Sequence, residues 1–431
     1  MTAPLEKLQS TTIICRGGLD SNRNWLQINQ VNPGVASELI NFEPSLFGGY
    51  RRINGYAYLE DVDSGYVDSA GAEGAILGIF IYNNQILAAR KQQSGAIYSF
   101  YLWVDGVGWT EYVTGLTHTS TNVTRIRYET FNFNGTESVI FVDGVNNALL
   151  FNGTTWVFIA PGGTGANYAN SGGANALAAP KYVTKFRRHL MISGDATSPH
   201  VVAHCAPDEE FDWTTAGGAG QLNAALAVKQ IKPFRDEVYV FGSVKIKKIT
   251  ISGSTFTIQD VTNNVGCIAS DSVIEINGDL LFLAKDGIRP ISATERNNDI
   301  EIASISKSIQ QEIKDLIDEH NMDDVKTLVI NDKSQFRLFF SESTDAITAA
   351  HGIVGAIRQY GEESVWEFGI LQGFLVSCCT SGSISTNPVT EYVLHGGFDG
   401  KVYRQEIGNS FNGSDIYAQY SMPYLDFGNP M

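Results

Sequence analysis

The chain has 431 residues, 43% of them hydrophobic and 18% charged, a composition typical of a folded globular protein and not of a disordered one. Its 30 basic and 46 acidic residues give a net charge of −16, which argues against a surface that grips nucleic acid phosphates broadly. No uninterrupted apolar run approaches the roughly 20 residues that cross a bilayer, so we expect no membrane insertion by this chain.

Residues 1–65 are expected to form an irregular N-terminal arm. Its stretch NFEPSLFGGYRRINGY, Asn41 to Tyr56, holds aromatic residues and two adjacent arginines around glycine turns. A stretch of this kind must pack against something, and we expect it to cross the main domain and contact a neighbouring subunit. The alternative is that it only supplies the strand that closes the last repeat of the main domain. The candidate interface residues are Phe42, Phe47, Gly49, Tyr50, Arg51, Arg52 and Tyr56. The two arginines are expected to pair with acidic partners.

A polar turn followed by a short apolar strand recurs about every fifty residues along residues 66–410. These turns lie at or near Asn84, Gly135, Arg188, Asp236, Gly278, Lys333 and Val389. Further strands and a Gly-containing turn complete each repeat, which therefore offers about four short strands. This pattern predicts an all-β fold, a β-propeller of six or seven four-stranded blades, in which radial closure protects the strand edges.

Aromatic residues open the outer strands of several repeats. They are Trp109, Trp156, Phe256 and Trp366. Large aromatic side chains at equivalent places in a repeated unit favour packing between blades. A cage for a ligand is the alternative interpretation.

Few residues suggest chemistry. His200 and His204 have the spacing of a metal pair on a helix, but the valines after Pro199 favour a strand, which would hold the imidazoles about 13 Å apart. The acidic run Asp208–Asp212 lies in one loop and does not place two carboxylates across a sugar. We therefore expect no catalytic residues, no metal site and no cofactor, and predict that the protein is not an enzyme.

Two further features are interpreted as structural. The glycine-rich segment Gly162–Pro180 does not join a strand to a helix as a phosphate-binding loop does, so a long flexible connection between strands is expected. The five cysteines have no zinc spacing and are expected to be buried thiols. Adjacent Cys378 and Cys379 would point to opposite faces of a strand, which disfavours a disulfide between them.

One segment departs from the strand pattern. Apolar residues at helical spacing predict an amphipathic helix of about four turns at about residues 305–320, with Ser304 or Ser306 as its N-cap. These apolar residues are Ile305, Ile309, Ile313, Leu316 and Ile317. The acidic face, made by Glu312, Asp315, Asp318 and Glu319, is expected to be solvated. The alternative is that this face docks on a neighbouring subunit or lines a pore. Residues 411–431 are expected to form a C-terminal strand segment that leaves the propeller.

Several motifs resemble those of one family. They lie at Pro33–Glu43, Gly49–Arg52, Gly55–Tyr56, Val265–Ile288 and Gly396–Glu406. They are similar to motifs of the tail nozzle or DNA-stabilisation (head-completion) virion proteins of short-tailed bacteriophages, and the segment Gly17–Tyr56 resembles the N-terminal arm of those proteins. The resemblance departs at the end of the chain, where similar proteins usually continue.

The resemblance implies a structural protein of the virion tail, assembled in the host cytoplasm, whose propeller-bearing subunits form a hexameric ring. Such a nozzle extends the DNA conduit below the portal and adaptor. The implied partners are further copies of the chain, the tail adaptor, and tail fibre or needle proteins. Duplex DNA would pass through the lumen without tight binding. The basic residues Lys245, Lys247, Lys248, Arg187 and Arg188 are then expected to face protein partners. The alternative function is a receptor- or glycan-binding propeller of a tail tip or spike.

Overall fold

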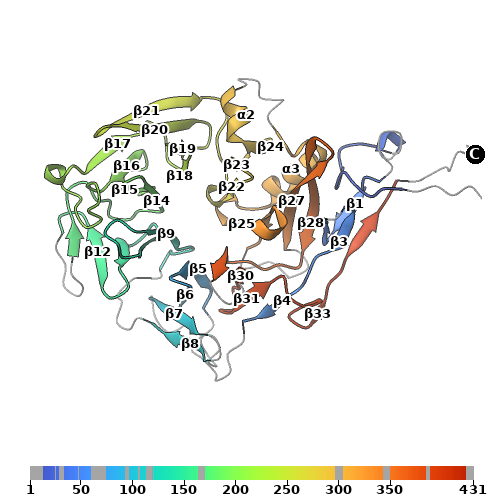
Figure 1. Ribbon diagram of the computed structural model, residues 1–431, viewed down its shortest axis with the longest axis horizontal. Coiled ribbons are helices and arrows are strands. Elements are labelled where there is room, and N and C mark those ends of the chain that lie inside the picture. Colours follow the sequence, from blue (N-terminus) through green and yellow to red (C-terminus); the bar gives the residue numbers. More distant parts are fainter. Residues whose placement is uncertain are drawn as a thin grey trace, which may run out of the picture.

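The computed structural model of the chain describes residues 13–24, 26–28, 34–46, 48–59, 74–92, 97–104, 107–112, 119, 121–163, 170–296, 304–342, 350–384 and 389–423. In this part of the chain, seven sheets follow one another around a common axis (Figure 1). The first strand of each sheet lies innermost, against the first strands of neighbouring sheets. The predicted all-β propeller is therefore confirmed, and the described residues form seven blades.

The first four blades each contain four consecutive antiparallel strands. Blade 1 comprises β5 (Ile76–Tyr82), β6 (Gln85–Lys91), β7 (Tyr98–Val104) and β8 (Gly108–Glu111). Blade 2 comprises β9 (Arg127–Phe131), β10 (Ser138–Val142), β11 (Ala148–Phe151) and β12 (Trp156–Ala160). Blade 3 comprises β14 (Tyr182–Phe186), β15 (His189–Ser193), β16 (Val201–His204) and β17 (Gly220–Asn223). Blade 4 comprises β18 (Gln230–Phe234), β19 (Glu237–Phe241), β20 (Ile246–Ser252) and β21 (Thr255–Thr262).

The other three blades depart from four consecutive strands. Blade 5 has β22 (Ile274–Ile276), β23 (Asp279–Ala284) and β24 (Gly287–Pro290), and the short helix α2 (Ile291–Arg296) follows in place of a fourth strand. Blade 6 is built from β25 (Val325–Ile330), β26 (Gln335–Phe340), β27 (His351–Tyr360) and β28 (Glu363–Gln372), extended by β1 (Glu38–Ile40) and β34 (Gln419–Ser421). Blade 7 is built from β29 (Cys378–Ile384), β30 (Thr390–Gly396), β31 (Val402–Gln405) and β4 (Tyr56–Tyr58), extended by β32 (Ser410–Phe411) and β33 (Ser414–Asp415).

All seven turns used to predict the repeat lie between the first and second strands of a blade. Two of these hairpins use residues that tolerate a left-handed backbone. Asn83 and Asn84 have φ of 48° and 61°, and Asn277 and Gly278 have φ of 51° and 75°. Positive φ at both central residues matches the strand twist of a two-residue hairpin, so the local sequence sets the position of each turn.

Blade 7 is closed by a strand from the opposite end of the chain. The strand β4 pairs antiparallel with β31, where Tyr58 lies opposite Tyr403 and Tyr56 lies opposite Gln405. Residues 56–58 therefore complete the sheet that residues 378–405 begin. This arrangement closes the ring of blades without leaving the β31 edge open.

Three of the four aromatic residues at the outer strands pack between blades, as predicted, whereas the ring contacts of Trp366 are with Phe336 and Phe368 of its own blade 6. Trp109 of blade 1 is buried in a cluster with residues of blade 7, and Trp156 of blade 2 is buried in a cluster with residues of blade 1. The ring centroids of Trp156 and Phe100 are 5.2 Å apart. Phe256 of blade 4 lies 4.2 Å from the ring of His204 in blade 3. These contacts place the hydrophobic core between neighbouring blades.

The predicted amphipathic helix is confirmed as a 3-10 turn, Lys307–Ile309, that continues into α3 (Gln310–Glu319). Ile309, Ile313 and Leu316 are buried with side chains of blades 5 and 6, whereas Asp315, Asp318 and Glu319 are exposed. Ser306 precedes the 3-10 turn, but its hydroxyl accepts a hydrogen bond from the Ile288 amide and does not cap the helix.

The segment Gly162–Pro180 was expected to be a long flexible connection. Its described part instead contains β13 (Asn170–Gly172), which pairs parallel with β12 as a fifth strand of blade 2. Gly172 and Gly173 lie very close to neighbouring backbone. A Cβ atom on Gly172 would lie 2.0 Å from the Ala160 carbonyl oxygen, and one on Gly173 would lie 2.6 Å from the Trp213 backbone. Glycine at these positions lets the segment pack against blade 2, which composition alone did not reveal.

Candidate functional site

The N-terminal arm lies on the outer strands of blades 6 and 7 (Figure 1). Strand β1 runs parallel to β28, with Ile40 opposite Ile370, and pairs antiparallel with β34 of the C-terminal segment. A hairpin of β2 (Phe42–Pro44) and β3 (Tyr50–Arg52), named here the arm hairpin, packs against β27 and β28. The arm therefore crosses two blades of its own propeller, and its strand β4 closes blade 7. A contact with a neighbouring subunit stays a prediction.

Asn41 joins the arm to blade 6 and to the C-terminal segment. Its buried side-chain amide donates to the carbonyls of Gln372 (3.0 Å) and Tyr417 (2.8 Å), and its Oδ1 accepts from the Gln372 amide (2.9 Å). Its φ of 54° is left-handed, a conformation that Asn tolerates better than most residues. One side chain therefore fixes three segments that are distant in the sequence.

The predicted aromatic residues contact the C-terminal segment of the same chain. The Tyr50 ring lies 5.4 Å from Tyr420, and its hydroxyl accepts from the Gly18 amide (2.9 Å). Phe42 lies 6.3 Å from Tyr420. Tyr56 is buried against Phe411, with ring centroids 4.8 Å apart. The aromatic residues of the arm thus hold the two ends of the chain together.

The other candidate residues of the arm hairpin have polar or conformational roles. Arg51 Nε lies 2.8 Å from Glu43 Oε1, so its predicted acidic partner is found within the chain. Arg52 instead donates to the amide oxygen of Asn409 (3.1 Å), which differs from the predicted acidic partner. Gly49 has φ of 73°, as the hairpin turn requires. Phe47 lies outside the described residues.

Two carboxylates and two cations form a buried cluster beneath the arm hairpin. This arm charge cluster consists of Glu43, Lys333, Arg337 and Glu406, which come from β2, from the turn before β26, from β26 and from the residue after β31. Glu43 lies 2.6 Å from Lys333 Nζ and 3.2 Å from Arg337 Nη2, and Arg337 lies 2.5 Å from Glu406. The cluster therefore connects the arm, blade 6 and blade 7 through charge.

The electrostatics of the cluster favour its charged form. Burial raises the pKa of Glu43, but the charges of Arg337 and Lys333 outweigh that effect and hold it at about 2. The same two cations lower the pKa of Glu406 against the effect of its burial. Sequence reasoning missed this cluster. The available signal was Arg337, a single cation within the apolar strand QFRLFF.

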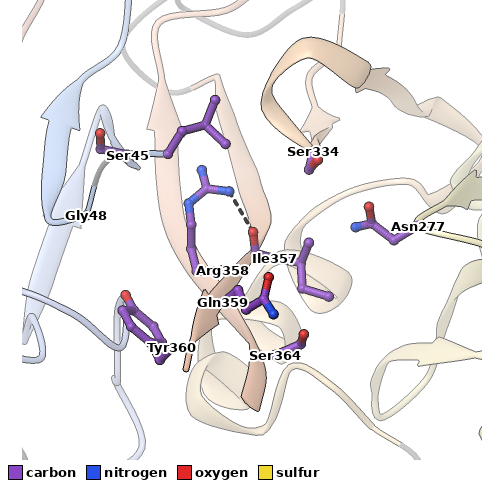
Figure 2. A pocket seen from close by; sticks show the side chains of 10 residues that line it. Ser45, Gly48, Asn277, Ser334, Ile357, Arg358, Gln359, Tyr360 and Ser364 are labelled. Atoms are coloured by element: carbon purple, nitrogen blue, oxygen red, sulfur yellow. Dashed lines mark hydrogen bonds between the residues drawn. The ribbon is translucent and has the colours of Figure 1, made fainter. Parts of the chain in front are cut away.

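A cavity of about 510 Å³ opens beside the arm hairpin, between its turn and the β27–β28 hairpin (Figure 2). This arm pocket is lined by Ser45, Leu46, Gly48, Asn277, Ser334, Ile357, Arg358, Gln359, Tyr360 and Ser364. Most of these side chains are polar, and they come from the arm, blade 5 and blade 6. The pocket therefore exists only because the arm lies on blade 6.

Arg358 is the cation of the arm pocket. Its guanidinium donates to the carbonyls of Ile357 (2.7 Å), Lys333 (3.3 Å) and Pro44. Its Nε is buried without a hydrogen-bond partner among the described residues, and burial lowers its pKa. Carbonyl dipoles therefore hold this charge in place, and an incoming carboxylate would gain a charge-assisted hydrogen bond.

Exposed apolar side chains are concentrated near the two ends of the chain. The described arm residues 13–59 and the residues 408–423 are named here the terminal platform. Its exposed large hydrophobic residues are Ile14, Leu26, Leu46, Tyr417 and Met422, which are half of those in the described chain. Blades 1 to 5, although longer, contribute Val104, Val107 and Val244. The terminal platform, a small part of the described chain, therefore holds a disproportionate share of the exposed large hydrophobic residues.

The residues considered for metal binding do not form a site. His204 is buried on β16 against the ring of Phe256, whereas His200 is exposed before that strand. The described residues contain no group of three or more potential metal ligands. In the acidic run Asp208–Asp212, Asp208 forms an ion pair with Arg188.

Among the helices of the described residues, none is long and apolar enough to span a membrane.

All five cysteines are free thiols. Cys205, Cys267 and Cys378 are buried, as predicted, whereas Cys15 and Cys379 are only half-buried. Burial raises the pKa of Cys378 to about 11 and that of Cys379 to about 12. Both are on β29 as neighbours, and no disulfide joins them.

Four of the five basic residues expected to face protein partners pair within the chain. Their ion pairs are Lys247–Asp260, Lys248–Glu237, Arg187–Asp236 and Arg188–Asp208. Lys245 lies near Asp260 and helps to lower its pKa, after the larger effects of Lys247. Three of these pairs lie within one blade, whereas Arg187 of blade 3 pairs with Asp236 of blade 4.

No protein-family model and no curated protein matches the sequence. Among solved structures, the chain is similar to Raptor of Chaetomium thermophilum, with 8% identity and a TM-score of 0.43 over 86% of this chain and 29% of that chain. It is also similar to the extracellular domain of a one-component system from B. thetaiotaomicron, with 10% identity and a TM-score of 0.44 over 83% of this chain and 40% of that chain. The chain spans less than half the length of these solved chains.

Proposed function

We propose that this protein is a structural subunit of a short bacteriophage tail. In this proposal, copies of the chain assemble into a ring, hexameric as the family resemblance implies, that extends the DNA conduit below the portal and adaptor. The observation that carries the proposal is the terminal platform, which holds half of the exposed large hydrophobic residues of the described chain although the propeller is already closed. The subunit has a structural role and no enzymatic one.

The terminal platform has the properties of an interface. Apolar surface gains about 25 cal/mol per Å² when a partner covers it, so exposed side chains such as Leu46 and Tyr417 favour association. Strand β34 is the outermost described strand of the blade 6 sheet, and an edge strand offers unpaired backbone groups. The arm pocket lies beside Leu46 and supplies Arg358 for an acidic side chain of the neighbour.

A ring follows if the terminal platform contacts a different surface of the next copy. Such a head-to-tail contact repeats from copy to copy and closes when the rotation between neighbours divides a full turn. The tail adaptor and the tail fibre or needle proteins would then meet the remaining faces. The protein would be assembled in the host cytoplasm and would reside in the virion tail.

The mass of the native assembly tests this proposal. We expect the purified chain at micromolar concentration to form a closed ring of defined mass, measured by native mass spectrometry and analytical ultracentrifugation. Leu46→Asp together with Tyr417→Asp should shift the population to monomers, because each change places a charge in the apolar part of the interface.

A matched control is Val244→Asp in the turn between β19 and β20 of blade 4. Val244 is 52% exposed and Leu46 is 55% exposed, so neither change buries a charge, and blade 4 is not a neighbour of blades 6 and 7, on which the terminal platform lies. The control variant should assemble as the unchanged protein does. A trimer would favour the alternative of a tail spike, and a protein that stays monomeric at all concentrations would contradict the ring.

A further inference from the structure

A second, smaller cavity of about 140 Å³ lies where the inner strands of the blades converge. Its wall residues come from β5, β9, β14, β18 and β29, and from the 3-10 turn Ser270–Ser272 that precedes β22. They include Arg125, Arg127, Lys232 and Asp271. Because residues of six blades line it, this cavity, named here the axial cavity, lies at the centre of the propeller.

Two arginines share one carboxylate in the axial cavity. Arg127 binds Asp271 through Nε and Nη2, each 2.7 Å from a carboxylate oxygen, and Arg125 Nε lies 3.2 Å from Asp271 Oδ2. The two arginine side chains are only 13% and 11% exposed. The Nη1 atom of each arginine is buried and has no hydrogen-bond partner within the part of the chain that the structure describes. Two positive charges and two unused donors therefore remain against a single negative charge.

Other cations add to this excess. Lys232 also lines the cavity, and Lys326 on the neighbouring β25 is 4% exposed and donates to the Ser341 carbonyl (2.8 Å). Burial, followed by the charge of Arg125, lowers the pKa of Lys326 to about 8. Burial alone lowers the pKa of a lysine, and the charge of Arg125 adds to that effect, so Arg125 and Lys326 lie close enough to repel each other.

The nearby acidic groups have other partners. Glu129 lies 3.7 Å from Lys185, and Asp323 lies 3.1 Å from Lys229. Asp271 itself keeps its charge, since Arg125 and Arg127 outweigh the effect of its burial and hold its pKa at about 2. Glu129 also faces Lys232, and Asp323 also faces Arg127, so these carboxylates offset part of the positive charge of the cavity. They do not use the two Nη1 donors, which stay available to a further anion.

We propose that the axial cavity binds one small oxyanion, such as inorganic phosphate, between Arg125 and Arg127. An oxyanion accepts charge-assisted hydrogen bonds from guanidinium groups, and it would use the two unpaired Nη1 donors. The volume exceeds the roughly 10–15 Å³ that a single water needs. The bound anion would join the inner strands of several blades. This inference stands independently of the ring proposal, because it concerns the inside of one propeller.

Thermal unfolding in the presence of inorganic phosphate tests the inference. We expect phosphate to raise the Tm of the full chain saturably, by about 3 °C when it is present at 100 times its Kd, relative to sodium chloride at equal ionic strength. Isothermal titration should give one phosphate per chain. A rise that never saturates, or that chloride reproduces, would overturn the inference, because general salt effects act in that way.

Two variants with opposite expected effects keep the test decisive. Arg125→Gln removes the surplus cation but leaves the Arg127–Asp271 pair intact. The affinity of the chain for phosphate should therefore fall at least tenfold. Asp271→Asn removes the competing carboxylate and should strengthen phosphate binding. Arg188→Gln, at an exposed ion pair in blade 3, is the control and should leave binding unchanged. Equal phosphate affinity in all variants would overturn the inference.

Discussion

At the scale of single residues, Glu43 is the side chain on which the position of the arm depends. It is buried, yet it contacts Arg51, Lys333 and Arg337, which come from three separate segments. Burying a carboxylate costs free energy that only such cations recover, and removing it leaves their charges buried with fewer partners. The arm charge cluster therefore makes the arm part of the propeller.

Glu43→Gln should lower the free energy of unfolding by about 3 kcal/mol, because the change leaves the buried Arg337 with one carboxylate where it had two. Equilibrium unfolding in urea measures the loss. The control is Glu319→Gln at the exposed end of α3, where a change within about 0.5 kcal/mol is expected. Equal stability of both variants would show that the cluster contributes nothing.

The same residue makes stability depend on pH. The pKa of Glu43 is about 2 in the folded chain against an ordinary value of 4.5, so folding favours the deprotonated form. Its contribution is complete above pH 4.5 and is lost as the pH falls through about 2, because the unfolded chain then binds the proton first. Urea midpoints between pH 7 and pH 2 should fall less steeply for Glu43→Gln than for the unchanged chain. Parallel curves would contradict this assignment.

At the scale of elements, the strand β4 should determine the stability of blade 7. Tyr56 is buried among Phe411, Phe374 and His395, with ring centroids 4.8, 5.4 and 4.9 Å away. Tyr56→Ala removes these contacts and leaves a cavity, so a loss of about 3–5 kcal/mol is expected.

Tyr417→Ala is the matched control for Tyr56→Ala, because Tyr417 also lies in the terminal platform but is 60% exposed. Urea unfolding should show a change of no more than about 0.5 kcal/mol for this control. If the two variants were equally stable, β4 would not be the strand that holds blade 7 closed.

The elements that could be predicted are those whose structure is determined by residues close together in the sequence. The turns of the repeat and the helix α3 are encoded by neighbouring residues, so their positions followed from turn residues and apolar spacing. The helix α2 was missed because a pattern of six residues is too short to distinguish from a strand.

The candidate site was predictable only in part. The sequence predicted that the aromatic arm packs against other parts of the protein. The Glu43–Arg51 pair is also a local feature, because the short arm hairpin places these two residues opposite each other. The partner Arg337 is 294 residues away from Glu43, and no local pattern encodes that contact. The parallel pairing of β1 with β28, which creates the arm pocket, is likewise set by tertiary packing.

At the scale of the whole molecule, net charge should decide whether the assembly binds duplex DNA tightly or lets it pass without binding. Six chains of −16 each would carry 6 × −16, or about −96 charges, which repels phosphates. Lys247, Lys248 and Arg188 are moreover paired with carboxylates of their own chain.

We therefore expect the assembled protein to show no measurable affinity for duplex DNA at physiological salt. Fluorescence anisotropy with a labelled duplex, titrated at several salt concentrations, measures this. Tight binding that weakens steeply with salt, and that is lost when Lys245, Lys247 and Lys248 are neutralised, would contradict the expectation and indicate a clamp.

The closure of blade 7 by β4 also sets the order of events during synthesis. The ribosome makes β4 about 340 residues before its partner β31, a delay of roughly 20 to 70 seconds at 5–20 residues per second. Strand β1 waits still longer for β34. The nascent propeller therefore cannot close before β31 has been made, and until then its early strands remain open to wrong pairing or to chaperones. Because β34 completes the terminal platform only after all seven blades have been made, a stalled or truncated chain cannot offer that surface, and incomplete subunits would be kept out of any assembly that uses it.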